Sequence, residues 1–238
     1  MLDIHYMRES FPKILAGVPV SISMAAIAIF CGLIIGLLLA LVRIYNIKFL
    51  KQLAIVQISF FRGTPLLVQI FLCYYGLPLL LRAISGSSDS ISGIPAVVFM
   101  YLSLSLNVSA YLSETIRGAI MAVPSGQTEA AYSLGMTRLQ TMKRIVLPQA
   151  FKIALPNFSN IFISILKDTS LAFTISVPEI VGEAKIVAGR TSRFFEVYII
   201  AALLYWILCI LLEQVFRYME GRIKQNKERG RNVSSQKC

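Results

Sequence analysis

Long apolar runs separated by short polar segments dominate this sequence. A helix of about 20 apolar residues crosses the hydrocarbon core of a bilayer, and five runs approach or exceed that length. They lie at about 14–42, 57–81, 90–113, 153–176 and 197–216, and Lys167-Asp168 interrupts the fourth. The pattern predicts an all-α integral membrane protein with five transmembrane helices. Residues 1–216 are expected to form one transmembrane domain, and 217–238 a basic tail.

Composition supports a membrane protein. The chain has 238 residues, of which 56% are hydrophobic, and its mean hydropathy is +0.71. A net charge of +11 on a soluble protein would suggest nucleic acid as a partner. Here the cations lie at the ends of apolar runs, so membrane topology and anionic lipid head groups explain them better. The four cysteines form no C-x-x-C pair and His5 has no second ligand nearby, so no metal site is expected.

The distribution of the basic residues predicts the orientation. With the N-terminus outside, 16 of the 23 Lys and Arg residues fall inside, which the positive-inside rule favours. The polar segment at 117–152 is then a cytoplasmic loop, Ser85–Gly93 is a short outer loop, and the C-terminus is cytoplasmic. The inner cations are Arg43, Lys48, Lys51, Arg62, Arg117, Arg138, Lys143, Arg144, Lys152, Arg217, Arg222, Lys224, Lys227, Arg229, Arg231 and Lys237.

The cytoplasmic loop predicts two short helices. Ser125 is expected to cap the first, and Gly135 to end it in the left-handed conformation. Thr137-Arg138-Leu139-Gln140 fits a capping box for the second, which is expected to stop before Pro148. An apolar face that lies against the membrane helices is predicted from the spacing of Leu139, Met142 and Val146.

The same loop carries a pattern that indicates docking of another protein. Glu129-Ala130-Ala131 is followed by Gly135, then by Ile145, and then by Leu147-Pro148. Small residues permit close backbone approach, so the first helix could seat in a cleft of a partner. The alternative is an amphipathic surface helix that merely borders the membrane. Glu-Ala-Ala alone would indicate only a helix, but the full spacing favours docking.

The loop resembles the EAA loop of ABC importer permeases, and flanking strings narrow the resemblance to the polar amino-acid uptake group. These strings cover nearly the whole chain in the order of that family. They are Phe61-Arg62-Gly63-Thr64-Pro65-Leu66-Leu67-Val68-Gln69, Tyr74-Tyr75-Gly76-Leu77-Pro78, Gly126-Gln127-Thr128-Glu129-Ala130-Ala131, Leu147-Pro148-Gln149-Ala150 and Lys167-Asp168-Thr169-Ser170-Leu171.

The resemblance implies a type I importer permease fold with a cytoplasmic coupling helix, in a bacterial inner or plasma membrane. It also implies a second permease subunit (a second copy or a paired homologue), two ATPase subunits and an external solute-binding protein. The coupling residues would be Glu129, Ala130, Ala131, Gly135, Leu147 and Pro148. Cystine is weakly favoured as cargo, and glutamine, arginine and histidine remain open.

The sequence itself indicates that energy comes from elsewhere. It contains no G-x-x-x-x-G-K-[ST] phosphate loop, so the chain is expected to have no enzyme activity and no cofactor of its own. ATP would be bound by the partner subunits. A stand-alone ion-coupled secondary transporter is the alternative, but it leaves the docking loop unexplained. An embedded enzyme would need a catalytic constellation that one histidine cannot supply.

Several polar residues fall inside the predicted spans, where charge is costly and commonly functional. Lys167-Asp168, with the hydroxyls of Thr169 and Ser170, is either a structural ion pair or a polar break facing the substrate pathway. Arg62 either extends to the interface or contacts a gate. Gln69 and Asn107 are expected to join helices, with pathway lining second.

Two further charged groups are expected to be structural or solvated. Glu114 and Arg117 have the spacing of an i,i+3 ion pair. An outer segment of mixed charge either contacts a binding protein or is a solvated loop. Its charged residues are Glu179, Glu183, Lys185, Arg190 and Arg193.

Overall fold

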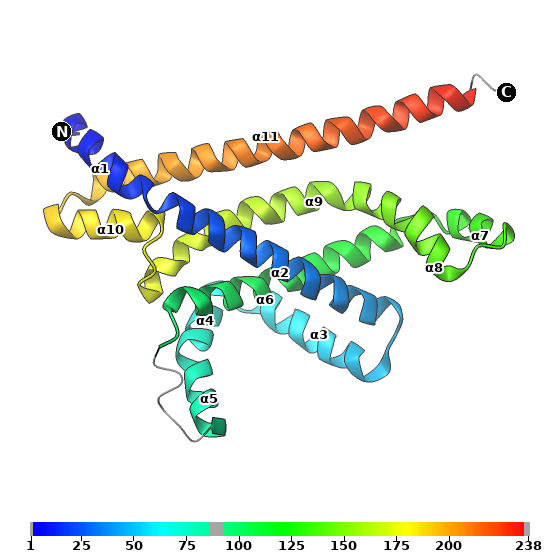
Figure 1. The fold of residues 1–238 in the computed structure, drawn as a ribbon, viewed down its shortest axis with the longest axis horizontal. Coiled ribbons are helices and arrows are strands. Elements are labelled where there is room, and N and C mark those ends of the chain that lie inside the picture. Colours follow the sequence, from blue (N-terminus) through cyan, green and yellow to red (C-terminus); the bar gives the residue numbers. More distant parts are fainter. Residues whose placement is uncertain (1, 86–92, 236–238) are drawn as a thin grey trace.

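A computed structural model describes residues 2–85 and 93–235, with side chains as far as residue 222, and this part of the chain is helical without strands. The helices run mostly along one long axis (Figure 1). Four of them are long and apolar enough to cross a membrane, and a bent pair formed by Arg138–Ile175 and Ile180–Thr191 brings the number to five. The first residues of the predicted third span and most of the predicted outer loop lie outside the described residues.

The first span is longer than predicted. It consists of α1 (Ile4–Leu15) and α2 (Val18–Ile44), and both ends extend beyond the expected 14–42. A short break precedes Pro19, because proline fits the first turn of a helix but not its interior. The helix α2 lies directly against α6 (Ala96–Met121), where a Cβ added to Gly36 would stand 2.9 Å from the carbonyl oxygen of Ser109. Small residues therefore bring these two helices together.

The predicted second span is broken at Thr64-Pro65. Before the break, α3 (Lys48–Gly63) packs against α6, and after it follow α4 (Leu66–Phe71), the π-helix η1 (Leu72–Gly76) and α5 (Leu77–Ser85). Pro65 cannot continue a helix, and Thr64 is extended with ψ 148°. The bounds 57–81 are thus corrected, since the apolar run joins two helices of different direction.

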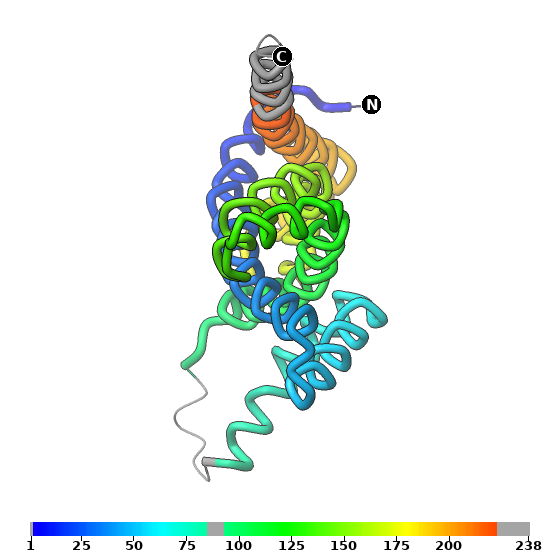
Figure 2. Tube along the Cα trace, turned by 90° about the vertical axis from the view of Figure 1, so that its right-hand side faces the viewer, coloured from blue at the N-terminus to red at the C-terminus, as the bar shows by residue number. Residues whose placement is uncertain are grey.

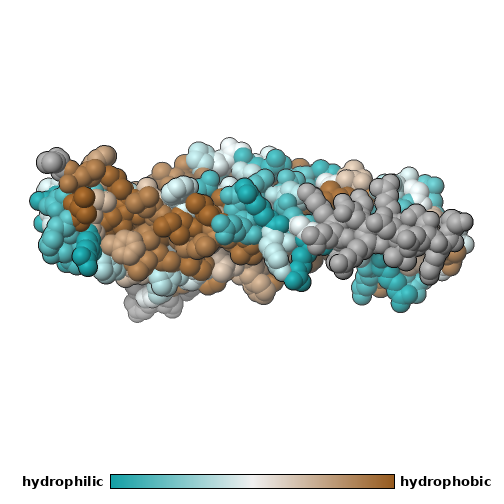
Figure 3. Space-filling model, turned by 90° about the horizontal axis from the view of Figure 1, so that it is seen from above, coloured by the Kyte–Doolittle hydropathy of each residue, from teal (hydrophilic) through white to brown (hydrophobic). Residues whose placement is uncertain are grey.

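The centre of the bundle is built around α6, which contacts α2, α3, α4 and α9 (Leu147–Asp168). Its side chains Met100, Leu104, Val108 and Leu112 are fully buried in the main hydrophobic core. The 3₁₀ helix η3 (Thr169–Ile175) extends α9, and α10 (Ile180–Thr191) follows after a turn. The helix α11 (Phe194–Ser235) then runs back along the bundle. Viewed from the α11 side, a broad apolar band lies beside hydrophilic surface (Figure 3).

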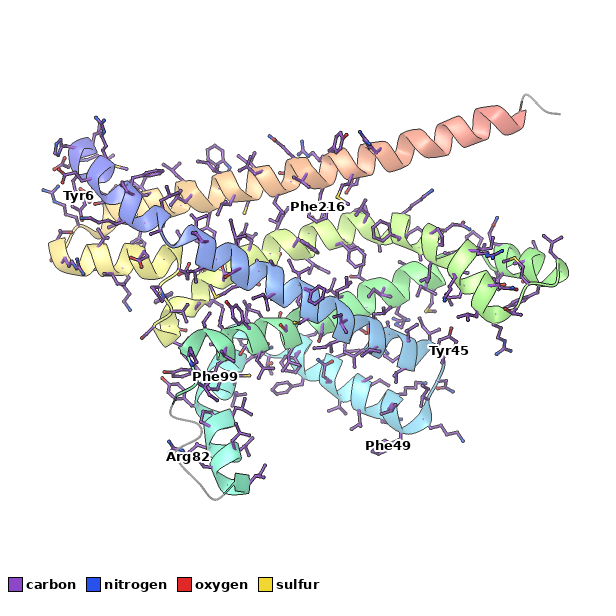
Figure 4. The ribbon with its side chains drawn as sticks, viewed as in Figure 1. Tyr6, Tyr45, Phe49, Arg82, Phe99 and Phe216 are labelled. Carbon is purple, nitrogen blue, oxygen red and sulfur yellow. The ribbon has the colours of Figure 1, made fainter. Side chains whose placement is uncertain are left out.

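The two ends of the bundle differ in what they contain. One end, here called the α1–α10 end, holds α1, α10 and the start of α11, and Figure 4 labels Tyr6 there. The opposite end, here called the α7–α8 end, holds α7 (Ser125–Ser133), α8 (Arg138–Thr141) and the π-helix η2 (Met142–Val146). These three short elements connect α6 to α9 (Figure 1). They occupy the middle of the predicted loop at 117–152.

Candidate functional site

The first candidate site is the turn unit formed by α7, α8 and η2. Gly135 has φ +76°, as expected for the residue that ends α7. Its N–H donates to the Tyr132 carbonyl at 2.9 Å, and the N–H of Met136 donates to the Ala131 carbonyl at 3.1 Å. Together these two bonds form a Schellman motif. Local hydrogen bonds therefore fix the end of α7.

A capping box begins α8, as the sequence predicts. Thr137 Oγ1 accepts from the Gln140 N–H at 3.3 Å, and Gln140 Oε1 accepts from the Thr137 N–H at 2.8 Å. The predicted cap at the start of α7 is wrong, because Ser125 is already the first helical residue and Pro124 precedes it without a side-chain hydrogen bond.

The predicted end of the second helix before Pro148 is also wrong. The chain passes from α8 through η2 directly into α9, whose first turn contains Pro148. Proline lacks the N–H that an α-helix would use, and a π-helix alters the hydrogen-bond pattern in the turn before it. The Gln149 side chain donates to the Ile145 carbonyl at 3.0 Å. The turn unit is thus continuous with a membrane helix.

Exposure separates the predicted coupling residues into two groups. Glu129, Ala130, Gly135, Leu147 and Pro148 are exposed, whereas Ala131 is buried within the chain. Of the predicted apolar face, Met142 and Val146 pack against α6 and α9, but Leu139 is 62% exposed. The correction follows from the π-helix, which adds a residue to the turn and rotates Leu139 off that face. Other exposed apolar side chains here are Met121, Tyr132 and Leu134.

The second candidate site is a polar furrow along α6 and α9. It consists of two adjoining hollows of about 510 and 210 Å³ that share Tyr111, Asn160 and Ile161 in their walls. Four predicted pathway residues lie in these walls: Arg62, Asn107, Lys167 and Asp168. The Arg62 guanidinium lies 5.7 Å from the centre of the Tyr111 ring. The structure therefore places Arg62 and Asp168, which are 106 residues apart in sequence, in the walls of adjoining hollows.

Gln69 and Asn107 join two helices beside the furrow. The Asn107 amide donates to Gln69 Oε1 at 2.8 Å, and both side chains are buried. The Gln69 amide donates to the carbonyls of Phe61 at 2.9 Å and Thr64 at 3.0 Å. These bonds satisfy backbone oxygens that the break at Thr64-Pro65 leaves without helical partners. Gln69 therefore stabilises the break, whereas Asn107 also reaches the furrow.

The polar residues at 167–170 also divide into two that line the furrow, Lys167 and Asp168, and two that do not. The α-helix continues through Lys167 and Asp168 and tightens at Thr169, so the predicted interruption lies one residue later. In the described part of the chain, no ion-pair partner lies within 4.0 Å of Lys167 or Asp168. Thr169 is fully buried and donates to the Leu166 carbonyl at 2.7 Å. Ser170 is half-buried and does not line the furrow.

Glu114, in the wall of the furrow's smaller hollow, forms ion pairs with two cations. The predicted pair with Arg117 is present at 2.8 Å, and Arg43 of α2 adds a second ion pair to the same carboxylate. Sequence spacing could not identify Arg43, because 71 residues separate it from Glu114. The available signal was its place at the end of the first apolar run.

Sequence reasoning also missed a buried carboxylate at the α1–α10 end. Glu179 is fully buried and caps α10, where it accepts from the Gly182 N–H at 2.8 Å. It further accepts from the Tyr205 hydroxyl at 2.7 Å and from Ser21 at 3.3 Å. The segment expected either to contact a binding protein or to be a solvated loop therefore contains a helix, and the charge that caps this helix lies in the interior.

The chain is similar to known membrane transport proteins over most of its length. Residues 32–225 match the family described as binding-protein-dependent transport system inner membrane component. The chain is 41% identical over 227 residues to the L-cystine transport system permease protein TcyL of Bacillus subtilis (strain 168), with 95% of this chain and 94% of that protein covered. It is 40% identical over 223 residues to the probable amino-acid ABC transporter permease protein PatM of Vibrio harveyi, with 94% and 97% covered.

A solved structure agrees with these relatives. An amino acid ABC transporter with histidines has a TM-score of 0.82 and 35% identity to this chain, and the match covers 93% of this chain and 99% of that one. The expected all-α permease fold of type I importers is confirmed. The family match and the length of these alignments lead to one conclusion: this chain belongs to the binding-protein-dependent transport system inner membrane components.

Proposed function

We propose that this chain is the transmembrane permease subunit of an ATP-driven importer of a polar amino acid. The observation that carries the proposal is the turn unit, whose outward surface presents Glu129, Ala130 and the 82%-exposed Leu134 at the end of a membrane bundle. Exposed apolar side chains on a polar loop commonly mark a protein contact. The names of the relatives support an amino acid as cargo.

Two ATPase subunits are proposed to dock on this surface from the cytoplasm. Because α7 contacts α8 and η2, and η2 leads into α9 without a loop, a displacement of α7 would be passed on to α9. Alternating access follows: ATP closes the ATPase pair, the turn unit transmits that motion, and hydrolysis resets the pathway inward. The basic residues near this end favour a cytoplasmic C-terminus and an outer N-terminus. A solute-binding protein would then deliver cargo at the α1–α10 end.

The polar furrow is the proposed pathway. It presents the cations Arg62 and Lys167 and the anion Asp168, which suit the carboxylate and ammonium groups of an amino acid. Cystine is the favoured cargo because two relatives are named for its transport. Glutamine, arginine and histidine are the alternatives. Binding of labelled amino acids to the partner binding protein would decide among them.

Uptake measurements with variants of the turn unit test the proposed coupling. We expect Gly135→Pro and Glu129→Lys to abolish uptake while membrane insertion stays near wild type. Proline at 135 cannot adopt φ +76° and loses the N–H bond to Tyr132, so it disrupts the end of α7. Glu129→Lys only reverses an exposed charge, so it should leave the unfolding temperature near wild type. Glu9→Lys is the matched control, because it reverses an exposed charge at the opposite end of the bundle. Normal uptake in both turn-unit variants would refute docking. Uptake that ignores ATP depletion, with no ATPase recovered in a pull-down, would instead favour the ion-coupled transporter.

A further inference from the structure

An apolar groove lies between α11 and the helices next to it. Its volume is about 540 Å³, and every described side chain that lines it is apolar. The walls come from α2, α6, α9 and α11. Within the groove, the ring of Phe216 on α11 packs edge-on against Phe162 of α9, with 5.1 Å between the ring centres (Figure 4). This contact marks where α11 meets α9.

The groove is long enough for a lipid tail. Beyond Phe216, α11 diverges from α9 towards the α7–α8 end (Figures 1 and 4), and Figure 2 shows α11 at the outer edge of the bundle. Along α9 the lining extends from Leu147 to Phe162, which at 1.5 Å per residue is about 22 Å. One leaflet contributes about 15 Å of the hydrocarbon core, so the groove can hold one acyl chain.

Cations lie where the groove opens towards the α7–α8 end. On α11, Val215 and Met219 line the groove, and Arg222 follows on the same helix face, at steps of four and three residues. On η2, Lys143 precedes the lining residue Leu147 by four residues, which is about one turn of a π-helix. Arg222 and Lys143 are exposed. Neither has an ion-pair partner within 4.0 Å among the described side chains.

The neighbours of Arg222 place it at the depth of lipid head groups. Its guanidinium lies 4.9 Å from the centre of the Tyr218 ring, and this tyrosine is 61% exposed. Tyrosine is enriched at the membrane–water interface, and long basic side chains extend towards the head groups. Arg217, by contrast, pairs with Glu213 at 2.6 Å. An anion at the mouth of the groove would therefore meet Arg222 rather than a cation that already has a partner.

The groove and its mouth together favour one kind of occupant. An acyl chain suits the apolar walls, and a phosphate suits the cations. A second copy of this chain would bring the same cations to this end, and like charges repel. We propose that the groove binds one acyl chain of an anionic phospholipid, whose phosphate pairs with Arg222 and Lys143. The inference goes beyond the proposed function and uses it only to place this end of the bundle in the inner leaflet.

Photolabelling tests the site. The full chain, purified in the assembly it forms, is placed in nanodiscs that contain phosphatidylglycerol or phosphatidylcholine with the same diazirine-bearing acyl chain. We expect phosphatidylglycerol to label Phe151 and Met219 of the groove about fivefold more than phosphatidylcholine or better, since each cation near the surface favours an anionic lipid by about that factor. Phe30 on α2 is the control, because it is 66% exposed and lies outside the groove, so both lipids should label it equally.

Two pairs of variants separate the charge from the shape of the groove. Arg222→Gln should lower the preference for phosphatidylglycerol about fivefold, whereas Lys48→Gln, which removes an exposed cation at the start of α3, should leave it unchanged. Val215→Trp should fill the groove and reduce labelling by both lipids. Leu211→Trp is its matched control, since both residues lie on α11 and are 56% and 55% exposed, but only Val215 lines the groove.

The outcome is independent of transport. Both leaflets of a nanodisc contain the same lipids, so the labelling ratio does not depend on how the chain is oriented. Equal labelling of the groove by the two lipids, or a preference that persists in Arg222→Gln and Val215→Trp, would overturn the lipid site while ATP-driven uptake continues. Uptake that is independent of ATP would instead refute the proposed function and leave the labelling ratio as expected.

Discussion

The two ends of the bundle differ in how much of their polar and apolar surface is buried within the chain. At the α1–α10 end, Glu179 is fully buried and bonded to three elements of the same chain. A Cβ on Gly17 would stand 2.5 Å from the backbone of Glu179, so these elements are in tight contact. At the α7–α8 end, local caps hold the helices while Leu134 and Leu139 remain exposed. The α1–α10 end is therefore stabilised by contacts within the chain, whereas the α7–α8 end leaves apolar side chains free to contact a partner.

This difference indicates where stability and where function reside. A buried carboxylate with several donors is costly to disturb, because each orphaned donor loses a hydrogen bond that water cannot replace. A cap on an exposed helix affects only its own turn. Substitutions at the α1–α10 end should therefore lower the unfolding temperature, and those at the α7–α8 end should change uptake with little effect on stability.

The largest expected loss of stability comes from Glu179→Ala. The substitution leaves the buried Gly182 N–H and Ser21 hydroxyl without this acceptor and the Tyr205 hydroxyl with only Thr169, at 3.3 Å. We therefore expect the free energy of unfolding to fall by about 3 kcal/mol or more. Thermal unfolding in detergent would measure it. Glu183→Ala, one turn further along α10, is the control and should change stability by less than about 0.5 kcal/mol. Equal effects of the two substitutions would show that Glu179 contributes no specific network.

Gly17→Ala should have the next largest effect. Its Cβ would meet backbone atoms of Glu179 and Ile180 at 2.5 Å, and backbone cannot move aside as a flexible side chain can. We expect a loss of about 1–3 kcal/mol, typical of overpacking. Gly189→Ala in α10 is the matched control, since nothing lies within 4 Å of its Cβ. Alanine there should stabilise the helix by about 0.5–1 kcal/mol, so the two substitutions are expected to differ in sign.

The sequence predicted the features that depend on neighbouring residues. The capping box of Thr137 and the left-handed Gly135 follow from signals within four residues, and both are present. The apolar runs also located the membrane helices, because burial in hydrocarbon requires long apolar stretches wherever the chain packs. The exception is the second run, which joins two helices.

Features set by distant contacts could not be predicted. The burial of Glu179 depends on Ser21, which is 158 residues away, and its sequence surroundings resemble a solvated loop. Pro148 indicated a helix end, but the π-helix before it lets the chain continue. In the furrow, spacing identified Arg62 and Lys167 as polar residues in spans. Only the packing of α6 and α9 shows that they line adjoining hollows.

Thr137→Ala should cost less than either substitution at the other end. It removes the acceptor of the Gln140 N–H and should destabilise α8 by about 1 kcal/mol. Because this end is held by local bonds, we expect faster hydrogen exchange confined to 138–146 and an unchanged global unfolding temperature. Ser133→Ala is the control, since its hydroxyl only donates to a carbonyl already within helix α7, at 3.0 Å. A global loss of stability in Thr137→Ala would show that the α7–α8 end is more integrated than its exposure indicates.

The smallest expected effect is a pH dependence of the ion pair between Arg193 and Asp3, here called the tether, at the α1–α10 end. The Arg193 guanidinium donates to Asp3 at 2.5 Å and lowers the pKa of that carboxyl below its ordinary 3.8. A carboxyl with a depressed pKa in the folded state stabilises the fold above its ordinary pKa, and this contribution is lost as pH falls through the depressed value. The difference between the unfolding temperatures of wild type and Arg193→Gln should therefore stay constant from neutral pH to about pH 4 and become smaller below it. Arg193 also lies 4.8 Å from the centre of the Tyr6 ring, so a pH-independent difference should remain.

The control is Arg190→Gln, which replaces an exposed cation on α10 and should follow wild type throughout. A gap between wild type and Arg193→Gln that stays constant with pH would assign the tether to the aromatic contact alone.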